Sequence, residues 1–259
     1  MVAYHPWVEA AVLLLLAVSV PVALVAGRRW VGEWRARGWP ASQVPELPLN
    51  AADLLLFCGV MGLLVWGSGR LLHVAAAGWT VAFLGFKGVE VARFWRVAPS
   101  VAGALGHVRE SAVAYLALLP LVALAMAASL LVGRLLGWEA DTQEAVRLFL
   151  RAEGFWAVAG FLALACVAAP VAEECLFRGL LYPALKTRLG RPWAMGLTSV
   201  LFGAMHGHWA SFLSLTVLGL ALAVAYDATG RLGRAIALHV VFNSVTCALL
   251  LASKWLSPA

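Results

Sequence analysis

Charged residues are scarce in this chain, and that scarcity excludes most soluble proteins. Of its 259 residues, 12% are charged and 63% are hydrophobic, and the mean hydropathy is +0.89. Soluble domains carry about 25% charged and about 45–50% apolar residues. The composition therefore predicts an integral membrane protein. Because lipid offers the backbone no hydrogen bonds and no segment alternates like a barrel strand, we expect an all-α fold.

Cysteine is rare and several common catalytic motifs are missing. The sequence contains no GxSxG motif, no GxGD aspartate pair and no HExxH motif, and the last absence excludes a zincin. The net charge of +6 could indicate a nucleic-acid partner. The positive residues instead cluster in short loops, so we expect no nucleic-acid binding. Without a CxxC pair, we expect buried free thiols at all four cysteines, which are Cys58, Cys166, Cys175 and Cys247.

Long hydrophobic runs, by contrast, are abundant and predict a polytopic bundle of about eight transmembrane helices. Two of the runs, 71–86 and 193–206, are short for a complete span. The first run has no basic segment before it, so we interpret it as a retained helix rather than a cleaved signal peptide. The eight runs are 7–26, 51–68, 71–86, 111–136, 154–172, 193–206, 211–228 and 235–253.

Positive charges orient these predicted helices. Arginine and lysine concentrate in the segments 28–37, 87–109, 186–191 and 231–234, which fall on one side if the spans alternate. That side is expected to be cytoplasmic, and both termini would face outward. The loop 137–153 carries most of the carboxylates on the other side. Since the composition is rich in Ala, Arg and Trp, we expect a multi-pass protein of a bacterial inner membrane.

Two adjacent glutamates, Glu173 and Glu174, interrupt the apolar sequence and are followed by Arg178. A charged side chain in an apolar segment costs roughly 2.5–3.5 kcal/mol on insertion scales, so the pair indicates function by default. If Pro170 starts or kinks a helix, Glu174 and Arg178 share one face, while Glu173 points about 100° away. One carboxylate can then pair with the arginine while the other acts as a general base. A buried ion pair used only for packing would explain one glutamate but not the other.

Two further polar pairs follow the glutamates along the chain. Phe202 and His206 are four residues apart, as are His239 and Asn243, so each pair shares a helix face. Histidine can hold a water or bind a metal, and an asparagine amide can donate to an oxyanion. Each pair could instead serve only packing or interhelical hydrogen bonding. Taken together, the three clusters predict a water-activating site, and His208 is interpreted as a loop residue outside it.

In order and approximate spacing, these residues resemble the three motifs of the CPBP family, the CAAX protease and bacteriocin-processing group. The resemblance covers roughly residues 154–253, whereas the first 110 residues match nothing comparable. We therefore divide the chain into a variable N-terminal region, 1–110, and a catalytic membrane core, 111–259. The motifs are Glu173-Glu174-x-x-x-Arg178, Phe202-x-x-x-His206 and His239-x-x-x-Asn243.

The resemblance implies an intramembrane endopeptidase of about eight spans, with a polar cavity open to the cytoplasm or the adjacent leaflet. It also implies a role for each motif residue. Glu173 would activate the attacking water, helped by His206. Glu174 and Arg178 would order the site. His239 and Asn243 would stabilise the tetrahedral oxyanion.

The resemblance favours catalysis without a bound cofactor. Zinc is the alternative, because two histidines and a glutamate can hold this metal, and its ligands would be His206, His239 and Glu173. In the favoured scheme the same histidines would hydrogen-bond the water and the oxyanion directly.

The expected partners are the lipid bilayer and a peptide or protein substrate. Lipidated tails are one substrate class, while peptide leaders, C-terminal sorting tails and membrane-bound regulators fit a bacterium better. Two other functions stay open at this point. A non-catalytic membrane partner, such as an immunity or scaffold protein, would use the same fold. A transporter would show repeat symmetry in both halves, whereas the polar residues here are confined to the C-terminal half.

Overall fold

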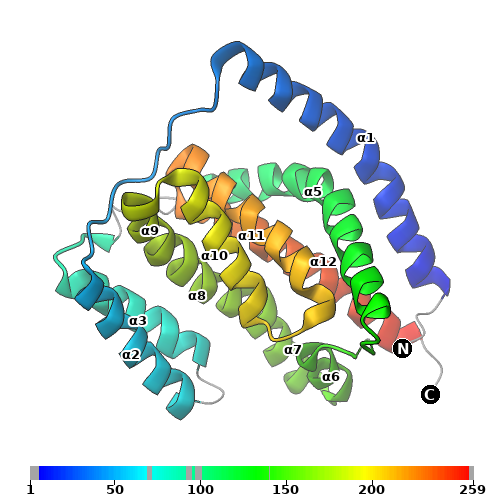
Figure 1. Ribbon diagram of the computed structural model, residues 1–259. Helices are drawn as coiled ribbons and strands as arrows, with labels where there is room; N and C mark the ends of the chain where they lie inside the picture. Colours follow the sequence, from blue (N-terminus) through cyan, green and yellow to red (C-terminus); the bar gives the residue numbers. More distant parts are fainter. Residues whose placement is uncertain (1–5, 69–71, 92–94, 97–100, 140, 257–259) are drawn as a thin grey trace.

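The regular structure of the described residues, 6–68, 72–91, 95–96, 101–139 and 141–256, is entirely helical in this computed structural model (Figure 1). The predicted all-α fold is therefore confirmed. In chain order the helices are α1 (Pro6–Arg37), α2 (Ala51–Ser68), α3 (Leu72–Phe86), α5 (Val101–Leu135), α6 (Glu144–Arg151), α7 (Phe155–Ala163), α8 (Ala169–Leu176), α9 (Tyr182–Leu189), α10 (Arg191–Met205), α11 (Trp209–Thr229) and α12 (Leu232–Leu256).

Among the described residues, five helical runs are long and apolar enough to cross a bilayer, which confirms a multi-pass membrane protein. The other three predicted spans are present as the helices α2, α3 and α10, which contain 18, 15 and 15 residues. Residue 71, the predicted start of the third span, lies outside the described residues. The five runs are Pro6–Arg37, Leu105–Leu135, Phe155–Leu189, Trp209–Thr229 and Leu232–Leu256.

The structure corrects the predicted end of the fifth span at residue 172. The helix continues without a break from Phe155 to Leu189, so the glutamate pair lies in its middle rather than at its end. Two π-helical turns, η2 (Leu164–Ala168) and η3 (Phe177–Leu181), interrupt the α-helix. A proline follows each turn by two residues, at Pro170 and Pro183. Proline lacks an N–H and clashes with the preceding turn, and the extra residue of a π-turn lets the helix continue past it.

The C-terminal helices form the core, and the N-terminal helices flank it on two sides. Helices α10 and α11 pack on each other, α11 and α12 pack on α5, and α1 lies along the outer side of α5. The α2–α3 pair packs on α8 at the opposite flank (Figure 1). The cysteine prediction is partly wrong: all four thiols are free, and Cys175 and Cys247 are buried, but Cys166 is only half-buried and Cys58 is exposed on α2.

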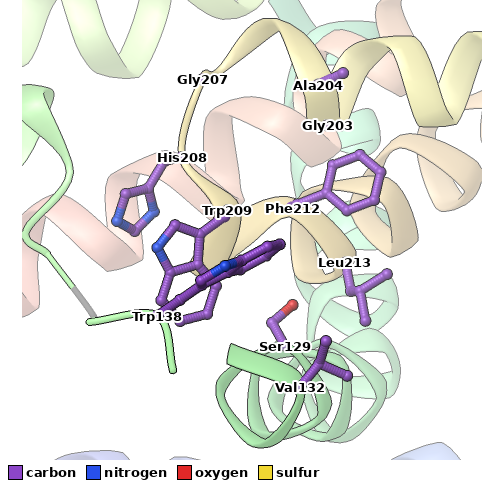
Figure 2. Close-up of a pocket in the computed structure, with 10 residues that line it drawn as sticks. All are labelled: Ser129, Val132, Trp138, Gly203, Ala204, Gly207, His208, Trp209, Phe212 and Leu213. Atoms are coloured by element: carbon purple, nitrogen blue, oxygen red, sulfur yellow. The ribbon is translucent and has the colours of Figure 1, made fainter. Parts of the chain in front are cut away.

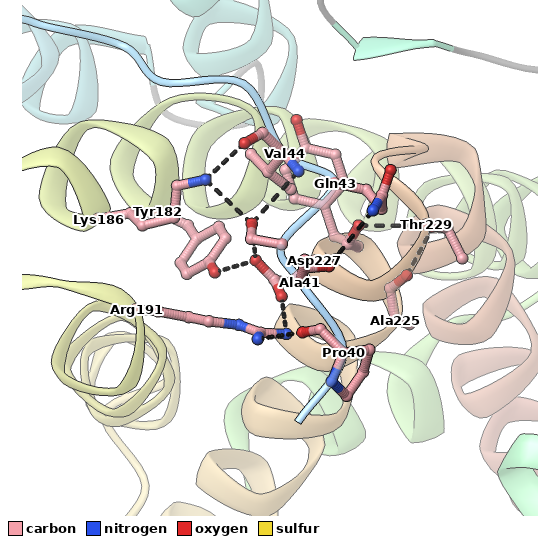
Figure 3. A network of polar contacts seen from close by, with 12 residues as sticks. Pro40, Ala41, Gln43, Val44, Tyr182, Lys186, Arg191, Ala225, Asp227 and Thr229 are labelled. Atoms are coloured by element: carbon pink, nitrogen blue, oxygen red, sulfur yellow. Dashed lines mark hydrogen bonds and ion pairs between the residues drawn. The ribbon is translucent and has the colours of Figure 1, made fainter. Parts of the chain in front are cut away.

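A polar network fastens the segment 40–49 across one end of the core (Figure 3). Asp227, fully buried near the end of α11, accepts hydrogen bonds from the Tyr182 hydroxyl at 2.5 Å and from Ser42, and it forms an ion pair with Arg191. The Gln43 N–H donates to the Asp227 carbonyl at 2.9 Å. Three of the basic segments, 28–37, 186–191 and 231–234, therefore lie close to one end, as the charge pattern predicts.

The second basic segment, 87–109, reaches the same end through the start of α2. Lys87 pairs with Asp53 at 2.9 Å, and Arg188 donates to the Leu49 carbonyl just before α2. Residues 92–94 and 97–100 of this segment lie outside the described residues. At the opposite end, Lys254 donates to the last carbonyl groups of α6, which satisfies that helix terminus.

Candidate active site

The glutamate pair and its arginine meet α12 in the middle of the long helix. The Arg178 Nη1 donates to Glu174 Oε1 at 3.0 Å, as the four-residue spacing predicts. The His239 Nδ1 lies 3.0 Å from the same oxygen, so it donates as well. Glu174 and Arg178 have no exposed surface, and His239 is 2% exposed. Glu174 therefore sits as a buried anion between two donors.

Aromatic rings and a backbone carbonyl enclose the arginine. Its guanidinium lies 4.7 Å from the Phe202 ring centre, and Nη2 donates to the Gly219 carbonyl at 2.7 Å. A Cβ at Gly219 would stand 3.1 Å from the Ser199 Cα, so glycine permits this close approach of α10 and α11. Because an unpaired buried charge is strongly unfavourable, these contacts fix Arg178 and with it Glu174.

Glu173 takes a different orientation from its neighbour. Its side chain is 17% exposed, and Oε2 lies 3.9 Å from the His239 Nε2. The two glutamates thus face opposite nitrogens of one imidazole. A separation of 3.9 Å is longer than a direct hydrogen bond and suits a bridging water.

His206 ends α10 and reaches the site through Phe202. Its ring centre is 5.0 Å from that of Phe202, and its Nδ1 lies 2.8 Å from the Phe202 carbonyl. The Phe202 ring is also 5.5 Å from the His239 ring, so both histidines pack against one buried phenylalanine. A carbonyl only accepts hydrogen bonds, so the His206 Nδ1 carries the proton and Nε2 is the basic nitrogen in the neutral ring.

Asn243 contacts the long helix rather than the glutamates. Its amide donates to the Ala165 carbonyl, inside η2, at 2.8 Å. In this π-turn the Ala169 N–H donates to Leu164, five residues back. The matching donor for Ala165 would be the nitrogen of Pro170, which has no hydrogen. Asn243 therefore completes the hydrogen bonding that the proline interrupts, and its second amide hydrogen is left for another acceptor.

At the second π-turn, Trp95 donates to a carbonyl that a proline leaves without a donor, as Asn243 does at the first. The sequence did not indicate this role of Trp95. Its indole N–H donates to the Gly179 carbonyl at 3.0 Å. In an α-helix that carbonyl would accept from Pro183, which has no N–H. A Cβ at Gly179 would stand 2.6 Å from the Trp95 Nε1, so only glycine leaves room for the ring. The available signal was Pro183, which follows the glutamate motif by five residues.

The loop that follows His206 borders a cavity of about 560 Å³ between α5, α10 and α11 (Figure 2). Gly203 and Gly207, on either side of His206, line it together with the rings of Trp138, Trp209 and Phe212. The cavity wall is almost wholly apolar. It gives an apolar group of a substrate a place next to the residues that carry His206.

His208 lies outside the cluster, in agreement with its interpretation as a loop residue. Its ring nitrogens contact the Ser211 hydroxyl and the Asp141 carbonyl, both at 2.9 Å. The Thr142 N–H, with a smaller contribution from Arg147, lowers the pKa of the exposed Asp141 carboxyl. This loop is thereby held as an anionic segment next to the end of α10.

The residues expected to hold zinc do not form a metal site. Within the part of the chain that the structure describes, no three His, Cys, Asp or Glu side chains are grouped for a metal ion. His206, His239 and Glu173 are all described, and each histidine donates from Nδ1, to the Phe202 carbonyl or to Glu174, which leaves its Nε2 as the nitrogen that a metal ion would take. In this arrangement the three side chains are not grouped around one point, so no catalytic step is assigned to zinc.

The fold and the site together define a multi-pass membrane protein with a buried acid–base cluster. The family model described as Type II CAAX prenyl endopeptidase Rce1-like matches residues 155–245, a stretch that contains all three motifs. Over these residues the chain is similar to the CAAX protease family, which confirms the predicted resemblance and indicates a membrane protease. No curated protein and no solved structure gives a significant match.

Proposed function

We propose that the chain is a glutamate-dependent intramembrane endopeptidase that cleaves the tail of a membrane-associated substrate. The observation that carries this proposal is the sharing of His239 between the two glutamates. Glu174 is held by Arg178 and Nδ1, at 3.0 Å each, while Glu173 faces Nε2 at 3.9 Å. A water between Glu173 and the His239 Nε2 would contact Glu173 as its base. It would also contact His239, which Glu174 and Arg178 hold in place.

The proposed reaction assigns separate tasks to the residues. Glu173 takes a proton from the water as its oxygen attacks the peptide carbonyl carbon, with the basic nitrogen of His206 as a second contact. The free amide hydrogen of Asn243 stabilises the oxyanion, together with the Nε2 proton of His239 in its imidazolium form, in which Nδ1 still donates to Glu174. When the C–N bond breaks, Glu173 passes its proton to the leaving amine.

The substrate class follows from the cavity beside His206. The cavity has a volume of about 560 Å³ and a mainly apolar wall, which suits a lipid group or an apolar segment near the scissile bond. The matched family is described as a prenyl endopeptidase, so a lipidated C-terminal tail is one candidate. An unlipidated sorting tail or a peptide leader is the other. We further propose that α2, α3 and α10 complete an eight-span bundle in a bacterial inner membrane, with the basic end in the cytoplasm.

The test is cleavage of a quenched peptide library, with lipidated and unlipidated C-termini, by the full chain in detergent. Glu173→Gln removes the base and should reduce turnover by about 10²- to 10⁴-fold, with or without a chelator. Glu139→Gln, an exposed carboxylate far from the cluster, is the matched control and should cleave like wild type. Loss of activity on chelation with rescue by zinc would contradict the metal-free scheme. Equal, negligible turnover by folded wild type and Glu173→Gln would favour the non-catalytic partner.

A further inference from the structure

A second cavity, larger than the one beside His206, lies on the outer side of the bundle. It has a volume of about 790 Å³ and runs between α1 and the helices α5, α11 and α12. Small residues make the hollow, because their side chains do not fill the space between α1 and the core. They include Ala23 and Gly27 of α1, Ala114 and Ala117 of α5, and Ala225 of α11.

An apolar chain is the occupant that suits this wall. Ordered water needs two to four polar partners, and the lining residues are almost wholly apolar. Leaving the space empty would forfeit dispersion contacts along several helices. The hollow is about five times the size of the ~150 Å³ engineered cavity that takes up benzene. Within a bilayer, the apolar group that surrounds the helices and can enter this cavity is the acyl chain of a lipid.

The polar margin of the hollow is basic. A smaller cavity shares Ala26 and Trp30 with it and adds Arg29 and Glu33, on the last turns of α1. Arg28 and Arg29 are exposed, and within the described residues neither forms an ion pair. A third cavity continues the hollow to Arg234, which is already paired with Glu110. Because the segment 28–37 at the end of α1 carries four arginines against the single carboxylate of Glu33, this margin is net positive and complementary to a phosphate.

We propose that this groove binds a membrane phospholipid with an anionic headgroup. One acyl chain lies between α1 and the α5–α11 surface, and the phosphate lies beside Arg29. Basic pockets between transmembrane helices on the positive side of a membrane protein bind anionic headgroups in this manner. Leu238 forms part of the wall and precedes His239, so the acyl chain packs behind the helix that carries the histidine.

Native mass spectrometry of the full chain tests the proposal, after reconstitution with equal phosphatidylglycerol and phosphatidylcholine and extraction in mild detergent. Wild type should retain phosphatidylglycerol selectively. Arg29→Gln should lower the ratio of the two bound lipids roughly fivefold, since one interfacial arginine is worth about that factor. Ala114→Phe, at an exposed groove position, should fill the hollow and abolish retention. Arg134→Gln and Ala127→Phe, exposed positions of α5 away from the groove, are the matched controls and should behave like wild type.

Each other outcome overturns the proposal. Equal retention of both lipids by wild type would remove the headgroup site. Equal lipid retention by Ala114→Phe and Ala127→Phe, both folded by thermal unfolding, would place the bound lipid elsewhere. Displacement of the lipid by a peptide that the enzyme cleaves would assign the groove to the substrate instead.

Discussion

At the scale of single residues, Asn243 has a structural contact that can be separated from chemistry. Its amide satisfies the Ala165 carbonyl, which Pro170 leaves without a donor. Asn243→Ala should therefore lower the free energy of unfolding by about 0.6 to 3 kcal/mol, the lower bound being typical of bilayer proteins. In a Pro170→Ala background the new N–H can serve the carbonyl, so the same substitution should cost less.

A double-mutant cycle followed by thermal unfolding in detergent measures this difference without reference to activity. If Asn243→Ala costs the same stability with proline and with alanine at position 170, the contact with Ala165 is not what Asn243 contributes.

The sequence predicted the residue pairs that one helix carries, because four-residue spacing fixes a shared face. Glu174 with Arg178 and Phe202 with His206 are both in contact as expected. Contacts between different helices could not be predicted from the sequence. That one imidazole would face both glutamates depends on the rotation of α12 against the long helix, which no local pattern encodes. The partner of Asn243 depends on a π-turn register for the same reason.

At the scale of elements, the indole of Trp95 supports the half of the long helix that follows the glutamates. Gly179→Ala would place a Cβ 2.6 Å from the Trp95 Nε1, so the ring must move and its hydrogen bond is lost. We expect a loss of about 1–3 kcal/mol in stability. Because position 179 follows Arg178, we also expect lower turnover of the cleaved peptide.

Gly160→Ala is the matched control on the same helix, where an added Cβ meets nothing within 4 Å. It should leave turnover unchanged and be neutral or stabilising by up to about 1 kcal/mol. Thermal unfolding and peptide cleavage, measured on both variants, test whether the Trp95 contact supports the helix. Similar behaviour of the two alanine variants would show that the Trp95 contact does not support the helix.

Hydrophobic runs located the elements but misplaced several boundaries: α1 continues through the basic segment to Arg37, where a loop is expected, and α5 begins at Val101 rather than at 111. Every one of the eight predicted runs coincides with a helix or part of one. The run 154–172 ends just before the two glutamates, whereas the helix continues past them to Leu189. From the sequence, Pro170 is expected to start or kink a helix. The π-turns allow the helix to pass two prolines, and they keep the glutamates in mid-helix.

At the scale of the whole molecule, composition and loop charge predicted a multi-pass protein whose basic segments gather at one end. The contacts that hold these basic segments together were not predicted. Asp227 ends an apolar span and was not singled out, yet it joins the segment 40–49 to α9 and α10. The position of the segment 40–49 is specified by long-range contacts, because its own sequence has no regular hydrophobic pattern. It ties the N-terminal region to the core that carries the family match.

The central claim is that the two adjacent glutamates have different tasks, and stability and turnover measured together on one set of variants test it most directly. Glu173→Gln should lose turnover while keeping the wild-type Tm. Glu174→Gln should lower both, because it removes the carboxylate that neutralises a fully buried arginine, a change that typically costs about 3–5 kcal/mol. Wild-type turnover by Glu173→Gln, or an unchanged Tm for Glu174→Gln, would contradict this division of tasks.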